Sequence, residues 1–222
     1  MNPVLTWPFG IEHLFIPTEK SDGQVIGFSF RCIRMSPACA KTVRRGVVSI
    51  VHAACASAWC VLVGPRASRE QVEGAAGVLI GYLVWDGVEL LVDGSTTGPF
   101  FSMLAHHVGI IGLVFLNRRT TRFYYIFPVL YLGELSTVFL SLRVVYRTLG
   151  WQVRWNVAFA LSFFVSRIVA YGGILLHLWH ERVHLAVEPF EVKIAYATGV
   201  PALYALNLFW FYKIVRIALS GL

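Results

Sequence analysis

Charged side chains are scarce in this sequence: Asp, Glu, Lys and Arg make up only 14% of its 222 residues. A soluble domain usually carries about 25%. Hydrophobic residues reach 57%, and long apolar runs recur along most of the chain. These features exclude an ordinary soluble domain. We expect an all-α, polytopic membrane protein, because helices satisfy their own backbone hydrogen bonds in lipid.

Cysteine is also scarce, and the four cysteines form no CxxC pair. Neither a disulfide framework nor a zinc site is therefore expected. The sequence has no GxSxG element, phosphate-binding loop or dinucleotide fingerprint, and no nucleic-acid motif accompanies its net charge of +7. We expect no metal, no permanently bound cofactor and no nucleic-acid partner, and no particular oligomeric state is predicted. The cations are expected to set topology and to contact anionic headgroups.

Six apolar segments predict a bundle of six membrane-spanning helices, at 46–63, 75–92, 99–117, 122–142, 155–178 and 194–219. Pro201 falls inside the last segment and is expected to kink that helix. We predict one transmembrane domain over 41–219. Residues 1–40 are expected to form an N-terminal segment in the cytosol or at the membrane interface.

The distribution of cations predicts the orientation of the bundle. Of the 19 Lys and Arg residues, eleven fall on the side of the N-terminus, seven on the other side and one, Arg167, inside a span. Positive charge concentrates on the cytoplasmic side of membrane proteins. Both ends of the chain are therefore expected to be cytosolic.

Ionisable groups inside the predicted spans are expensive, at about 2.5–3.5 kcal/mol each at a helix centre. This chain places Asp86, Glu89, Glu134 and Arg167 in such positions. We expect Asp86, Glu134 and Arg167 to face the interior of the bundle and to find partners there. Glu89 lies near the end of its span and is expected to reach water.

Helical spacing places further polar residues on the same faces as these charges. The predicted stripes are Tyr82 with Asp86 and Glu89, Glu134 with Thr137 and Ser141, and Arg167 with Tyr171. We predict that substrate contacts come from polar residues of the spans, namely Tyr82, Arg167, Tyr171, His52 and Asn207. His52 stands among small residues, which favours a hydrogen bond between helices. Arg44 and Arg45 are expected to anchor headgroups.

Two adjacent histidines, His106 and His107, stand in the apolar run "MLAHHVGIIG" at 103–112. As a catalytic pair, one neutral imidazole would act as base or nucleophile while a carboxylate such as Asp86 fixes its tautomer. As a structural pair, both rings would only cross-link helices. A shared metal ion fits poorly, because the i, i+4 histidine spacing of metal sites is absent. Neighbouring residues lie about 100° apart on a helix, so only one ring is expected to point straight into a given site.

Several segments together resemble the TLC domain, the core shared by ceramide synthases, translocon-associated membrane proteins and several lipid-homeostasis proteins. In chain order they are "RRGVVSIVHAACAS" (44–57), "GYLVWD" (81–86), "MLAHHVGIIGLV" (103–114), "YLGELSTVFLSLR" (131–143), "RIVAY" (167–171) and "LNLFWFYKIVR" (206–216). The resemblance covers roughly 41–219. Ceramide synthases carry an "HDxSD"-type element where this chain has "GELST", with Gly133 and Thr137 in place of its first His and second Asp. The chain is therefore more similar to the small TLC-domain-containing proteins.

The resemblance implies a barrel-like bundle of six helices around a cavity that could accept an acyl chain. In the enzymes of the family, a His takes part in acyl transfer from acyl-CoA. Carried over, His106 or His107 would attack the thioester or deprotonate the acceptor. Asp86 or Glu134 would orient the imidazole, and Arg167 would balance the carboxylates. Acyl-CoA would then be a cosubstrate, and membrane lipids with their acyl chains the partners.

Three functions follow from this resemblance. The first is an acyl-CoA-dependent lipid acyltransferase. The second is a non-enzymatic lipid-binding or lipid-sensing protein that serves lipid homeostasis. The third is a membrane trafficking factor. The intact histidine pair and the carboxylates inside the spans favour the first two. The resemblance also implies an endomembrane location, the endoplasmic reticulum rather than the plasma membrane.

Overall fold

The structure is a computed structural model that describes residues 36–93, 98–120, 122–151 and 155–220. Most of the predicted N-terminal segment, 1–40, lies outside these residues. The elements in chain order are α1 (Pro37–Leu62), η2 (Gly64–Arg66), α2 (Arg69–Val92), α3 (Gly98–Asn117), η3 (Phe123–Ile126), α4 (Phe127–Tyr131), α5 (Glu134–Thr148), α6 (Asn156–Phe163), η4 (Phe164–Val169), α7 (Ala170–His180), α8 (Arg182–Leu185), α9 (Phe190–Ile194), η5 (Ala195–Gly199) and α10 (Val200–Ser220).

Six helices in the described part of the chain are long and apolar enough to cross a membrane, which confirms the six predicted spans. They are Pro37–Leu62, Arg69–Val92, Phe100–Asn117, Phe123–Thr148, Asn156–His180 and Phe190–Arg216. The described residues contain no strand, as expected for an all-α bundle.

The first two spans begin earlier than hydropathy predicts, because polar residues start both helices. Ser36 caps α1 by accepting the backbone N–H of Cys39 at 3.2 Å. Ser68 and Gln71 form a reciprocal capping box at the start of α2, with contacts of 2.9 and 3.3 Å. Hydropathy marks only the apolar part of a span, whereas these polar first turns extend both helices.

The last three spans are not continuous α-helices. The fourth is interrupted at Leu132 and Gly133, between α4 and α5. The fifth contains the π-helical turn η4, and the sixth contains the π-helical turn η5 at Ala195–Gly199. The irregularity of the last span therefore lies directly before Pro201, whose ring and missing N–H disturb the preceding turn.

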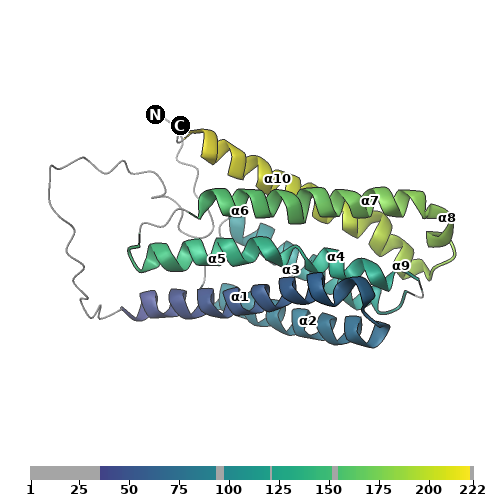
Figure 1. Cartoon of the computed structure of the whole chain (residues 1–222), viewed down its shortest axis with the longest axis horizontal. Helices are drawn as coiled ribbons and strands as arrows, with labels where there is room; N and C mark the ends of the chain where they lie inside the picture. The colour runs from purple at the N-terminus through teal and green to yellow at the C-terminus, as the bar shows by residue number, and fades with distance from the viewer. Residues whose placement is uncertain (1–35, 94–97, 121, 152–154, 221–222) are drawn as a thin grey trace.

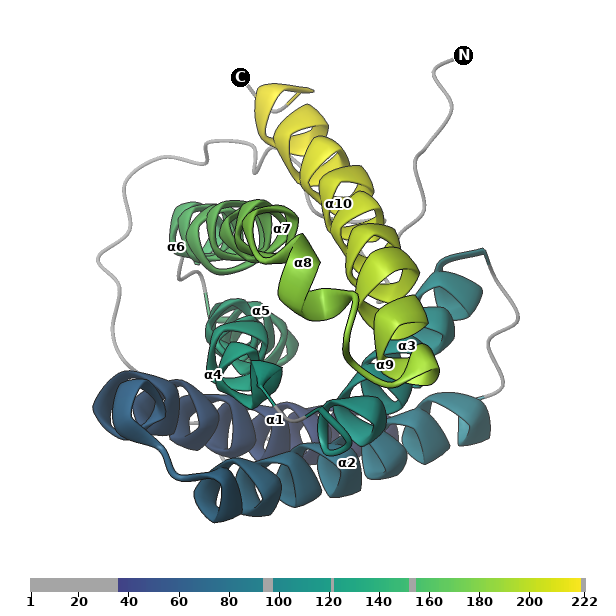
Figure 2. The same ribbon diagram turned by 90° about the vertical axis from the view of Figure 1, so that its right-hand side faces the viewer.

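The six spans run along the long axis of the molecule (Figure 1). The start of α1 and the end of α10 lie at one end of the bundle, here called the terminal end; α8 and the turn between α1 and α2 lie at the opposite end, the loop end. Figure 2, which looks along the bundle, shows the spans arranged as a ring rather than as stacked layers. Packing between helices follows the ring order α1, α5, α6 and α7, α10, α3, α2.

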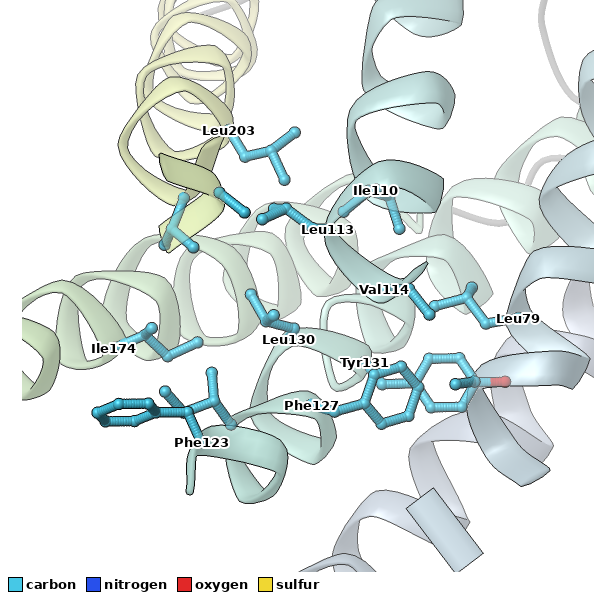
Figure 3. Close-up of a cluster of buried hydrophobic side chains, with 14 of the residues drawn as sticks. Leu79, Ile110, Leu113, Val114, Phe123, Phe127, Leu130, Tyr131, Ile174 and Leu203 are labelled. Atoms are coloured by element: carbon cyan, nitrogen blue, oxygen red, sulfur yellow. The ribbon is translucent and has the colours of Figure 1, made fainter. Parts of the chain in front are cut away.

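The main apolar core fills the loop half of this ring. Side chains from all six spans contribute to it, and Figure 3 shows Leu79, Ile110, Leu113, Phe127 and Leu203 among them. Phe123 and Phe127 are completely buried. This half of the bundle is therefore solid, because large side chains from all around the ring interdigitate at its centre.

Polar contacts close the loop end beneath the core. Glu188, which precedes α9, accepts the Thr120 hydroxyl at 3.0 Å and the Arg122 backbone N–H at 3.1 Å. Tyr196 donates to the side-chain oxygen of Asn117. These buried groups tie the last span to the end of α3.

The orientation of the bundle is open to a direct test. We expect tags inserted at 95 and at 185 to lie on opposite sides of the membrane, because three spans, an odd number, separate the two loops. The tag at 95 should be cytosolic, since the cation bias favours that side. Protease accessibility or glycosylation of the two tags measures this. Labelling of both tags from the same side would contradict the six-span arrangement.

Candidate functional site

The terminal half of the ring encloses a cavity of about 460 Å³. Its lining residues extend from the histidine pair near mid-span to Ala38 and Asp93 at the terminal end. One wall, from α1 and α2, carries charged and hydroxyl groups. The facing wall, from α6 and α10, is apolar and includes Phe159, Phe163, Trp210 and Ile214. A cavity of this size and character suits a ligand with a polar group and an apolar body.

His107 lies on the charged wall beside Asp86. Its Nε2 is 3.5 Å from Oδ2 of Asp86. The other carboxylate oxygen of Asp86 accepts the Nε–H of Arg45 at 2.9 Å. Asp86 therefore joins α1, α2 and α3 through its two oxygens. All three side chains line the cavity.

His106 belongs to a second cluster, around Arg167. The guanidinium Nη1 of Arg167 is 3.3 Å from Nε2 of His106, and its Nη2 is 3.9 Å from Oε1 of Glu134. The His106 ring also packs edge-on against Trp210, with 5.0 Å between ring centroids. Asp86, Glu134 and Arg167 are all buried within the bundle, which confirms that they face its interior rather than lipid.

The two histidines require opposite tautomers. A guanidinium can only donate, so Nε2 of His106 accepts and its proton sits on Nδ1. A carboxylate accepts, so Nε2 of His107 carries the proton and its Nδ1 holds the free lone pair. Neither Nδ1 has a hydrogen-bond partner among the described residues. The rings therefore differ in chemistry, as their offset on α3 predicts.

Both rings nevertheless line the same cavity, so the expectation that only one would face it is wrong. Their centroids are 6.1 Å apart. The cavity extends around α3 far enough to reach both, with α2 contacting one ring and α10 the other.

Arg167 owes its position to two irregular backbone segments. It lies in the π-helical turn η4, where the extra residue per turn changes the face that a side chain presents. The interruption before α5 leaves the Gly133 carbonyl available, and Arg167 donates to it at 3.2 Å and to the Ser136 hydroxyl at 2.9 Å. Thr137 adds a longer contact of 3.5 Å. Arg167 is thus held at the start of α5 by three groups besides Glu134, and by His106 on α3.

The predicted substrate-contacting residues separate into two groups. Tyr82 and Arg167 line the main cavity. The Tyr171 hydroxyl donates to the Leu130 carbonyl at 3.0 Å, away from the cavity wall. Asn207 is fully buried, and neither of its side-chain polar atoms is hydrogen-bonded to a described residue.

His52 also lies off the main cavity. Its ring stacks on Tyr82, with centroids 3.8 Å apart, and its Nε2 has no hydrogen-bond partner within the described ranges. The expected interhelical hydrogen bond is therefore wrong, because stacking replaces it. The Tyr82 hydroxyl instead reaches Ser49 on α1 at 3.0 Å.

Sequence reasoning missed a row of ion pairs between α1 and α2, here called the charge ladder: Lys41, Arg44 and Arg45 on α1 with Asp86, Glu89 and Asp93 on α2. Arg45 bridges Asp86 and Asp93 at 2.9 and 3.1 Å. Glu89 lies 3.6 Å from Arg44 and 3.8 Å from Lys41. Arg45 is therefore a wall residue of the site rather than a headgroup anchor, and Glu89 is a paired residue. The sequence could have predicted these ion pairs, because three cations and three carboxylates lie near the same end of two consecutive spans.

No group of three or more His, Cys, Asp or Glu side chains lies together as metal ligands in the parts of the chain that the structure describes. The chemistry of the cavity can instead be derived from its two imidazoles, its carboxylates and its guanidinium groups.

Comparison with known proteins agrees with this architecture. The family model of the TLC domain matches residues 43–216. The TLC domain-containing protein 4-B of Danio rerio is 26% identical over 196 residues, which cover 77% of this chain and 71% of that protein. The TLC domain-containing protein 2 of Danio rerio is 23% identical over 186 residues, covering 76% and 73%. No solved structure matches the chain. The matched region covers five spans and most of the first, includes both histidines, and shows that the chain belongs to the TLC domain family.

Proposed function

We propose that this chain is a membrane-embedded protein of lipid homeostasis that transfers an acyl chain from acyl-CoA to an amine or hydroxyl group of a lipid. The observation that carries the proposal is the His107 imidazole, paired with Asp86, in the wall of a cavity whose facing side is apolar. We also propose an endomembrane location, such as the endoplasmic reticulum, which rests on the family resemblance alone.

His107 is suited to the role of general base. Asp86 fixes the proton on Nε2 and stabilises the imidazolium that forms when Nδ1 accepts a second proton. The proposed reaction requires that Nδ1 of His107, which is enclosed beside α2 in this structure, opens to the cavity. It then takes the proton of the acceptor O–H or N–H as the acceptor oxygen or nitrogen attacks the thioester carbonyl. The C–S bond then breaks, and the thiolate of CoA leaves with the proton from the imidazolium. One acyl group and one proton are exchanged, and no oxidant or metal takes part in this sequence.

The second cluster supports the same reaction by stabilising charge. Arg167 lies between Glu134 and His106 and lines the cavity with both. A fixed guanidinium can stabilise the negative charge that develops on a thioester oxygen during attack. The acyl chain would lie against Phe159, Phe163 and Trp210, whose rings form the apolar wall.

One observation favours a non-enzymatic lipid-binding protein as the second candidate. Both Nδ1 atoms are enclosed by protein, and that of His107 lies beside Gly87, where a Cβ would be 3.8 Å away. Rings enclosed in this way would shape a lipid site without exchanging protons.

The test uses purified protein in lipid nanodiscs with radiolabelled palmitoyl-CoA and a mixture of membrane lipids. We expect labelled lipid and free CoA to form in equal amounts, since each transfer releases one CoA. Retention of labelled lipid probes without CoA release would support the lipid-binding alternative. Absence of both transfer and lipid retention would contradict both candidates.

A further inference from the structure

The charge ladder is a feature that the proposed chemistry does not use in full. Four of its six members line the cavity, Lys41 and Arg45 on α1 and Asp86 and Asp93 on α2. The side chains of Arg45 and Asp86 are 19% and 12% exposed, whereas those of Lys41 and Asp93 are 36% and 38% exposed. The ladder therefore extends from the reacting centre to the mouth of the cavity, and its outer pair is the more accessible.

The ladder joins α1 and α2 through long charged side chains rather than through close packing of the two helices. On its other side, α1 packs so closely on α5 that a Cβ at Gly46 would collide with Val145. Long side chains bridge from α1 to α2 instead. Ion pairs between such side chains can exchange partners without movement of either helix, because Lys and Arg rotate about several bonds.

The charges of the ladder balance, with three cations against three carboxylates. A headgroup with a single negative charge would pair with Lys41 and leave Asp93 with Arg45 as its only cation. A single cation would pair with Asp93 and leave Lys41 with Glu89 alone. Each case takes one partner from a member of the ladder, so both are disfavoured. A headgroup that carries an ammonium and a phosphate replaces both partners at once.

We propose that the outer pair of the ladder binds the headgroup of a zwitterionic phospholipid, with its phosphate on Lys41 and its ammonium on Asp93. The rest of this lipid extends inward from the outer pair toward His107. This inference names the lipid class handled by the cavity, and it therefore rests on the proposed function.

The test is competition for a fluorescent phospholipid bound to the protein in detergent, with no acyl-CoA present. We expect unlabelled phosphatidylethanolamine to displace the probe about tenfold better than phosphatidylglycerol, because phosphatidylglycerol has no ammonium to replace Lys41 beside Asp93. Soluble glycerophosphoethanolamine should compete poorly, since it lacks the acyl chains. Equal competition by the two lipids, or by the soluble headgroup, would overturn the proposal.

Variants assign the preference to the ladder. D93N removes the ammonium acceptor and should bring the ratio between the two lipids close to one or invert it. D93E keeps a carboxylate at this position and should keep the preference. E191Q is the matched control, because Glu191 forms an exposed ion pair with Arg119 at the loop end, at 2.7 Å. An unchanged ratio in D93N would contradict the assignment.

The design separates failure of this inference from failure of the proposed function. If D93N folds poorly, K41Q can be measured in the same competition assay. It removes the partner of the phosphate and should also weaken the preference for phosphatidylethanolamine. H107Q should keep the headgroup preference while losing transfer. Transfer without any headgroup preference would overturn only the present inference. A preference without transfer would support it and leave the cavity as a lipid-binding site.

Discussion

Replacing His107 with Gln is expected to lower acyl transfer by about 10²- to 10⁴-fold, the usual contribution of a positioned general base. The Gln amide can still donate a hydrogen bond to Asp86, so the link between α2 and α3 survives. It cannot accept and return a proton. The measurement is the initial rate of label transfer in nanodiscs, with lipid retention measured in parallel.

The neighbouring histidine supplies the sharpest comparison. In H106Q, the amide oxygen can accept from Arg167 as the imidazole does, so we expect a loss of less than about tenfold, well below the effect of a missing base. H184Q is the matched control, because His184 is exposed at the loop end. Equal rates in H107Q and H184Q would remove His107 from the mechanism. A loss in H106Q as large as in H107Q would contradict the division of roles between the two rings.

Replacing Arg167 with Met is expected to destabilise the bundle by about 3–5 kcal/mol, the cost of breaking one buried ion pair by removing a single partner. The change leaves the Glu134 carboxylate without its cation, and Glu134 is only 9% exposed. It also deprives the Gly133 carbonyl and Ser136 of the guanidinium. Unfolding free energies from denaturant titration in detergent micelles would measure the loss.

The double variant R167M/E134Q tests the cause of that loss. Neutralising Glu134 removes the uncompensated charge, so the double variant should be more stable than R167M alone. R119M is the control at an exposed ion pair, where we expect a change of at most about 1 kcal/mol. If R167M were as stable as R119M, Arg167 would not be a structural partner of Glu134.

The six spans could be predicted because lipid makes continuous apolar length a strong requirement, visible in hydropathy alone. The exact starts of α1 and α2 depend instead on capping by Ser36 and Ser68, which hydropathy does not register. The interruption before α5 and the π-helical turn η4 leave no periodic signature. They follow from packing between spans and could not be read from the apolar pattern.

Part of the site could be predicted, because an ionisable side chain is costly in lipid and is therefore expected to face the interior of the bundle. That cost correctly identified Asp86, Glu134 and Arg167 as groups that face the bundle. The cost of a charge in lipid does not predict which cation pairs with which carboxylate, because ion pairing depends on which helices are neighbours in the ring. Arg45 was therefore assigned to headgroups, although it is bonded to Asp86.

The division of the bundle into a solid loop half and a hollow terminal half makes the cavity a blind well rather than a passage. Below the cavity, the loop half is filled by the apolar core that contains Phe123 and Phe127, and neither of these residues lines the cavity. Under the proposed function, a lipid that enters this well leaves through the same mouth. Such a protein would act only on lipids that reach it from one end of the bundle.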